Sequence, residues 1–170
     1  MPLQVREAVS DDALPILLVH RAVIAEGRWF ITQPGELELE VRHVVQRVED
    51  MARSPNSLFL VGVEGRSVVG FITLTGGSLA LTRHNAKLEV MLAKGARGKG
   101  AGRLLMNKAL AWARASEMLE KIGLNVFADN EAAISLYRSL GFVEEGRRLR
   151  EYRAADGTHR DDVLLCLDVA

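Results

Sequence analysis

A glycine-rich turn between a strand and a helix is the feature that most restricts the fold of this chain. Residues 97–102 read Arg-Gly-Lys-Gly-Ala-Gly and follow a run of β-formers that ends near Ala93. An apolar stripe at helical spacing then predicts a helix from Gly102 to about Leu119. The turn amides therefore converge at the positive end of a helix, which predicts an anion site.

The chain before this turn alternates strand and helix patterns. We expect a strand at residues 3–8, a helix at 13–25 capped by residues 10–12, and a second helix at about 37–52. Two β-rich runs, residues 58–63 and 67–75, flank Glu64-Gly65-Arg66 and predict a hairpin. Residues 87–93 then predict the strand that enters the glycine turn.

The chain after the turn shows one more helix among strands. A buried strand is expected at residues 122–127, followed by a helix that Asp129-Asn130 caps and Gly141 ends. The runs 142–152 and 162–169 predict an antiparallel pair around the turn at 155–157. Hairpins mixed with helices predict an α+β (mixed α/β) fold, and we expect residues 1–170 to form a single domain.

Charge and composition exclude several partners. The 22 basic residues balance the 22 acidic ones, so we expect no nucleic-acid partner and no anionic membrane surface as a ligand. No apolar stretch is long enough for a membrane span or a signal peptide. Cys166 is the single cysteine, which rules out an internal disulfide and favours a reducing, cytoplasmic location.

The glycine turn suits a pyrophosphate but fits neither common nucleotide motif. Arg97, Lys99 and Arg103 place cations around it, while the glycines allow a close approach of the backbone. Counting from Gly98 or from Gly100 never places a third glycine as the dinucleotide motif requires, and the Walker A pattern fails as well. A nucleotide-binding protein is therefore disfavoured.

The sequence resembles the GNAT superfamily of acyl-CoA N-acyltransferases. Its R/Q-x-x-G-x-G/A signature is matched by Arg97, Gly100 and Gly102, with a strand at residues 88–92 before it. The Asn-Glu-Ala-Ala-Ile-Ser-Leu-Tyr run at 130–137 and the Gly-Phe at 141–142 follow in the family's order. The resemblance covers nearly the whole chain and looks closest to bacterial enzymes that acetylate amino acids or small amines, including the phosphinothricin-type group.

This resemblance implies a fold and a cofactor site. The implied fold has a central, mostly antiparallel twisted sheet of six to seven strands flanked by about four helices. In such proteins the turn amides hold the pyrophosphate of CoA, the preceding strand pairs with pantetheine, and an asparagine contacts the cofactor arm. The expected acetyl-CoA site is therefore formed by Met91, Leu92, Arg97, Gly98, Lys99, Gly100, Ala101, Gly102, Arg103, Asn130 and Tyr137.

Two residues are candidates for proton transfer. The resemblance places Tyr137 near the thioester sulfur, where its phenol could protonate the departing thiolate; the alternative is core packing on the apolar face of its helix. Glu89 is the candidate base for the amine because its strand adjoins the turn, and a water relay is the alternative. Trp29 and Phe30 either line the acceptor pocket or seal the core edge.

The expected function is transfer of an acetyl group from acetyl-CoA to the primary amine of a small molecule, by direct attack in a ternary complex. Alternatives are acetylation of a protein N terminus or lysine, and a non-catalytic acyl-CoA-binding module. The spacing of the four histidines does not predict a metal site. A homodimer is expected from the strand edges at the end of the chain.

Overall fold

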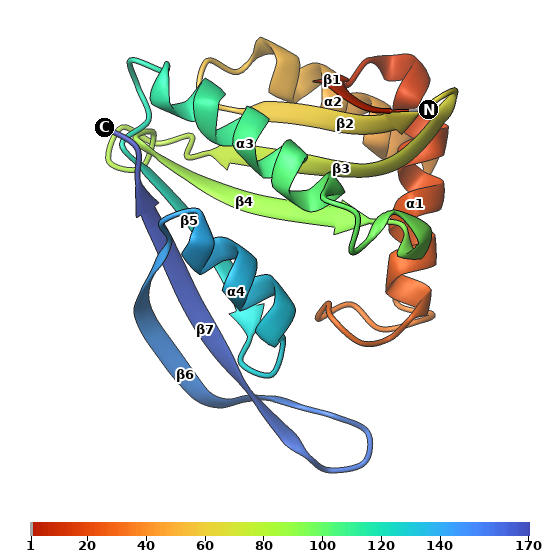
Figure 1. Ribbon diagram of the computed structural model, residues 1–170, viewed down its shortest axis with the longest axis vertical. Helices are drawn as coiled ribbons and strands as arrows, with labels where there is room; N and C mark the ends of the chain where they lie inside the picture. The colour runs from red at the N-terminus through yellow and green to blue at the C-terminus, as the bar shows by residue number, and fades with distance from the viewer. Residues whose placement is uncertain (1) are drawn as a thin grey trace.

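Seven strands within residues 2–170, the part of the chain described by this computed structural model, form one sheet (Figure 1). Their order is β1-β2-β3-β4-β5-β7-β6. Only the β4–β5 pair among them is parallel. The mixed, mostly antiparallel fold predicted above is confirmed. The strands are β1 Leu3–Glu7, β2 Leu58–Glu64, β3 Ser67–Gly76, β4 Asn85–Leu92, β5 Lys121–Phe127, β6 Val143–Arg153 and β7 His159–Asp168.

Helices cover both faces of the sheet (Figure 1). On one face, α3 and α4 bury Met106 and Tyr137 in a cluster that includes Leu88 of β4. On the other face, α1 and α2 pack in a second cluster that includes Met91 of β4. Because side chains alternate along a strand, β4 supplies both clusters. The helices are α1 Ala13–Ala25, α2 Val41–Arg53, α3 Ala101–Arg114 and α4 Glu131–Ser139, with short 3-10 turns η1 Ser10–Asp12 and η2 Lys94–Ala96.

Two helix boundaries differ from the predicted ones. Helix α2 begins at Val41 rather than near Leu37, although Leu37 still packs against the α1–α2 cluster from the preceding loop. Helix α3 ends at Arg114 rather than near Leu119, and the Ser116 hydroxyl then accepts the Leu119 amide at 3.2 Å. The apolar periodicity extends before the start of α2 and after the end of α3, because the adjoining loops also bury apolar side chains.

The start of α1 is held by an ion pair rather than by the predicted side-chain cap. The Asp12 carboxylate accepts the Val9 amide at 2.9 Å and pairs with the Arg6 guanidinium at 2.6 Å. That guanidinium lowers the pKa of Asp12 below its usual value. Since Asp12 makes no capping bond to α1, its side chain instead connects β1 to η1.

None of the helices between residues 2 and 170 is long and apolar enough to cross a membrane.

Cys166 lies half-buried on β7, where burial raises the pKa of its thiol.

A close contact between β3 and β4 leads to a prediction about stability. A Cβ atom added at Gly70 would lie 2.7 Å from the Met91 carbonyl oxygen, which is backbone and cannot move aside. We expect Gly70→Ala to lower the free energy of unfolding by about 2 kcal/mol, measured by urea denaturation. Gly146→Ala is the control, because nothing in the described chain lies within 4 Å of a Cβ there. Equal stability of the two variants would contradict this packing account.

Candidate functional site

The two parallel strands in the middle of the sheet separate along their length. Pairing between β4 and β5 ends at Lys87 and Gly123, yet β4 continues to Leu92 and β5 to Phe127. No β4–β5 register beyond that point is present within residues 2–170. Figure 1 shows the strands diverging from this point. The facing backbone groups of the strands therefore border a gap, which we call the β4–β5 gap, where an extended ligand could pair with β4.

The glycine turn lies at the end of β4, where α3 begins. Gly100 is the residue before α3 and has a φ of 85°, a left-handed conformation that favours glycine. No side chain of the described chain caps α3, and Leu104 donates its amide to the Gly100 carbonyl at 3.0 Å. Apart from chain neighbours, nothing lies within 4 Å of a Cβ at Gly98 or Gly100. The first amides of α3 thus have no capping side chain within the described residues and can bind an anion.

The three cations of the turn have different surroundings. Arg97 donates to the Leu92 carbonyl at 2.9 Å and to the Glu26 carboxylate at 2.7 Å, so its guanidinium already has internal partners. Arg103 is exposed and donates to the Ser139 hydroxyl at 2.8 Å. Lys99 is exposed and forms no ion pair within residues 2–170. Lys99 is therefore available to a phosphate, Arg103 is exposed beside it with one hydroxyl partner, and Arg97 fixes the end of β4.

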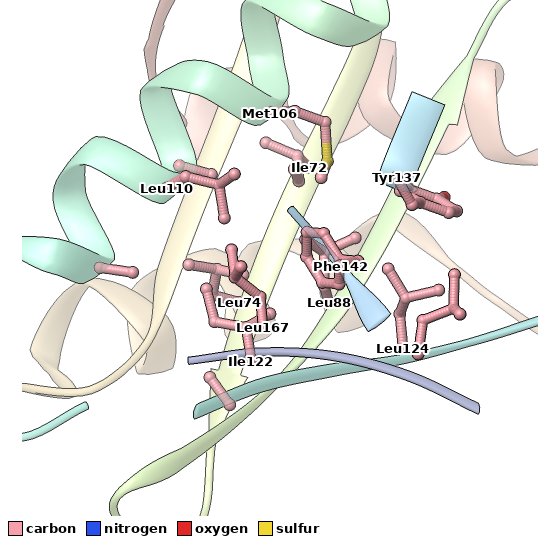
Figure 2. Packing of buried hydrophobic residues seen from close by; sticks show 14 of the residues in the cluster. Ile72, Leu74, Leu88, Met106, Leu110, Ile122, Leu124, Tyr137, Phe142 and Leu167 are labelled. Carbon is pink, nitrogen blue, oxygen red and sulfur yellow. The ribbon is translucent and has the colours of Figure 1, made fainter. Parts of the chain in front are cut away.

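Tyr137 lies on the α3–α4 face. Its ring centre is 5.8 Å from that of Phe142, and Figure 2 shows the ring at the edge of the drawn cluster. Only 8% of the residue is exposed, and burial raises the pKa of its phenol to about 12. The phenol is therefore neutral throughout the physiological range, and the same shift makes it a weaker acid than a solvent-exposed tyrosine.

The side chains of several other residues predicted to bind the cofactor have partners within the fold. Asn130 caps α4 by accepting the Ala133 amide at 3.3 Å, so its structural role is present whether or not it also contacts a ligand. The Met91 side chain is buried in the α1–α2 cluster, and its backbone pairs with Phe71 of β3, on the side away from the gap. The Leu92 side chain packs against the α3–α4 cluster. Ala101 is buried, whereas a Cβ added at Gly102 would lie 3.3 Å from Leu92 Cδ1, which explains the need for a small residue there.

Glu89 lies on the opposite face of the sheet from Tyr137. Its carboxylate accepts the Arg47 guanidinium at 3.1 Å, and the same nitrogen of Arg47 donates to Thr73 at 3.2 Å. His20 of α1 lies near both charges, and burial lowers the pKa of its imidazole. The Glu89 side chain is 32% exposed, so an amine in solution can reach it. A carboxylate and a neutral imidazole together can accept a proton here.

Sequence reasoning did not single out Arg47, Thr73 or His20 as site residues. Arg47 lies between Val44 and Val48, two of the buried residues of α2, and a charge inside an apolar stripe was the available signal. Thr73 and His20 carried no comparable signal. Their proximity to Glu89 depends on how α1 and α2 pack on β3 and β4.

The β4–β5 gap thus has an anion-binding end at the glycine turn, a proton donor on one face and a proton acceptor on the other. No cluster of three or more potential metal ligands is found among residues 2–170. Two surface cavities, of 370 and 240 Å³, lie elsewhere: one is lined by Trp112, Pro55 and Met118, and the other adjoins it. The chemistry that suits the gap is transfer of a group from an extended, phosphate-bearing donor to a nucleophile that loses a proton.

Comparison with known proteins is consistent with this geometry. Residues 24–142 match the acetyltransferase (GNAT) family. A spermidine N(1)-acetyltransferase from Vibrio cholerae is 32% identical over 94 residues, which are 55% of this chain and 53% of that protein. The matched segment thus spans about half the length of this curated relative.

Solved structures share the fold along almost the entire chain. A GNAT-family acetyltransferase from Streptococcus pneumoniae has a TM-score of 0.92 and 27% identity, covering 98% of this chain and 99% of that one. A phosphinothricin acetyltransferase from Sinorhizobium meliloti, solved in complex with AcCoA, has a TM-score of 0.82 and 18% identity, covering 99% of this chain and 89% of that one. At 18% identity, the likeness to the Sinorhizobium meliloti structure shows a shared fold and nothing further.

Proposed function

This chain belongs to the acetyltransferase (GNAT) family, and from that premise we propose that it transfers the acetyl group of acetyl-CoA to the primary amine of a small molecule. The observation that carries the proposal is the uncapped, glycine-rich start of α3 at the end of the β4–β5 gap. Acetyl-CoA, when bound, supplies an activated thioester and a thiolate leaving group. The remaining chemistry belongs to the chain's own residues.

Binding is assigned to the turn and to the edge of β4. We propose that the amides of Gly98 to Arg103 hold the pyrophosphate, with Lys99 and Arg103 as the neighbouring cations. The Leu92 amide, which points away from β3 toward the gap, would pair with pantetheine, whereas the Met91 backbone is already paired with β3. Arg97 contributes by holding the Leu92 carbonyl rather than by contacting phosphate.

Proton transfer is assigned to opposite faces of the gap. An acceptor amine arrives mostly as an ammonium, because an amine of the lysine type has a pKa of about 10.4. We propose that Glu89, positioned by Arg47, accepts that proton directly or through a water molecule. Tyr137, on the other face, donates its phenol proton to the departing sulfur. The proton donor and acceptor thus remain separated by the sheet.

The proposed acceptor is a small amine rather than a peptide. The loop between α1 and α2 covers the Glu89 face, and its aromatic residues Trp29 and Phe30 are only partly exposed. The relative from Vibrio cholerae is named a spermidine acetyltransferase, and the structure from Sinorhizobium meliloti a phosphinothricin acetyltransferase. A polyamine and free amino acids are therefore the first acceptors to test. The cytoplasmic location and the homodimer predicted above are part of this proposal and are testable by fractionation and light scattering.

The proposal is tested by calorimetric titration with acetyl-CoA, followed by CoA release assays with a panel of amines and one peptide acceptor. Micromolar binding and turnover with a small amine are expected. Binding without turnover would support a non-catalytic acyl-CoA-binding module, and turnover with the peptide alone would support a protein acetyltransferase. No binding at all would contradict the central claim.

Glu89→Gln tests the proposed base. The amide cannot take up the amine proton, but a water relay can partly replace it, so we expect kcat/KM at neutral pH to fall ~10-fold. The acidic limb of the pH profile should change as well. Glu64→Gln, at the exposed end of β2, is the control and should match the unmodified protein. An unaltered pH profile in Glu89→Gln would assign the proton to water alone.

A further inference from the structure

Two arginines attach one short segment to both sides of the β4–β5 gap. Residues 26–29, here called the strap, leave the end of α1 on the β4 side. Arg97, which follows β4, forms a two-pronged ion pair with Glu26, with both N–O distances 2.7 Å. Two residues further along, the strap meets β7: Arg160 donates to the Arg28 carbonyl at 2.7 Å. In Figure 1 the orange segment after α1 reaches below the end of β4 toward α4 and β5.

Arg160 is held more firmly than a surface arginine. Its guanidinium carbon lies 3.8 Å from the ring centre of Phe127 and 5.2 Å from that of Trp29, so it is stacked between β5 and the strap. Two of its nitrogens donate to Asp129, at 2.8 and 3.1 Å. Only 21% of the side chain is exposed. A planar guanidinium that stacks and bonds in this way is not replaceable by lysine.

We infer that Arg160 is a positioning residue that holds the strap across the open end of the gap and so forms the wall against which the acceptor amine binds. The inference rests on the proposed function for its acceptor. The strap connects the end of α1 to Phe127 and Arg160, and both α1 and Glu89 lie on the same face of the sheet. Acetyl-CoA meets the opposite side, at the turn and Tyr137. Loss of Arg160 should therefore affect the acceptor and not the cofactor.

The test uses Arg160→Met and Arg160→Lys, with Arg153→Met as the matched control. Arg153 is exposed on β6 of the same hairpin and forms no ion pair within residues 2–170. Trp29 and Trp112 are the two tryptophans of the chain, so all variants are made in a Trp112→Phe background, where fluorescence reports the strap. Acrylamide quenching of Trp29 in the substrate-free protein measures whether the strap is closed. Circular dichroism verifies folding. If Arg160→Met does not fold, the quenching and KM measurements are made on Arg160→Lys instead.

We expect Arg160→Met to raise the quenching constant of Trp29 at least ~2-fold and KM for the amine ~10-fold, with KM for acetyl-CoA little changed. Arg160→Lys should lie between Arg160→Met and the unmodified protein. Quenching no greater than in Arg153→Met would overturn the inference, and so would an equal rise in both KM values. The quenching measurement needs no substrate, so it decides the role of Arg160 in holding the strap even if the proposed acetyl transfer fails.

Discussion

Gly100→Glu is expected to abolish binding of acetyl-CoA. A carboxylate about 4 Å from a bound phosphate would cost several kcal/mol, so the Kd should rise at least ~100-fold. The added side chain has room, since nothing within the described residues lies within 4 Å of its Cβ. The charge would therefore occupy the space in front of the α3 amides without displacing them. Calorimetric titration of the purified variant measures this loss directly.

The control for this substitution is Gly157→Glu in the β6–β7 turn. Gly157 has a φ of 86° against 85° for Gly100, and its Cβ position is also free of neighbours in the described chain. Both variants should lose about 1 kcal/mol of stability, because glutamate is strained in the left-handed region. Only the Gly100 variant should lose its affinity for acetyl-CoA. Equal affinity in the two variants would place the pyrophosphate elsewhere.

Tyr137→Phe is expected to lower kcat ~100-fold with little change in either KM, because only the proton for the departing thiolate is lost. The ring that packs on Phe142 is retained, so the fold should be unaffected. Tyr152→Phe is the matched control, since the chain has two tyrosines and Tyr152 lies on β6. Steady-state CoA release measures the effect. A normal kcat in Tyr137→Phe would reduce the role of this residue to packing.

The phenol of Tyr137 also predicts a pH dependence of stability. Burial raises its pKa from 10.0 to about 12 in the folded chain. The protonated phenol therefore makes its full contribution to the free energy of unfolding below the pKa of the unfolded chain. This contribution is lost as the pH rises toward the pKa of the folded chain. Between pH about 9 and about 12 the unmodified protein should lose about 3 kcal/mol more than Tyr137→Phe, measured by urea unfolding. Parallel losses in the two proteins would show that the phenol is accessible to water.

Local patterns were sufficient for most of the fold. Hairpin signals around Gly65 placed β2 and β3, and Asn130 with Gly141 predicted both ends of α4 correctly. These features depend on residues within one turn of the chain, where propensity and capping act. The predicted end of α3 was wrong because Leu119 is buried in a loop, and burial alone does not distinguish helix from loop.

The sequence by itself determined the glycine turn, the strand before it and the order of the elements, because each depends on neighbouring residues. It also indicated Glu89 and Tyr137 as candidates for proton transfer. Only the tertiary structure decided that they lie on opposite faces of the gap, and that Arg97 is bound by Glu26 rather than free for phosphate. The tertiary structure also stacks Arg160 on Trp29, although the two residues are more than a hundred positions apart in the chain. Such pairs form only when helices pack on the sheet, so no local pattern specifies them.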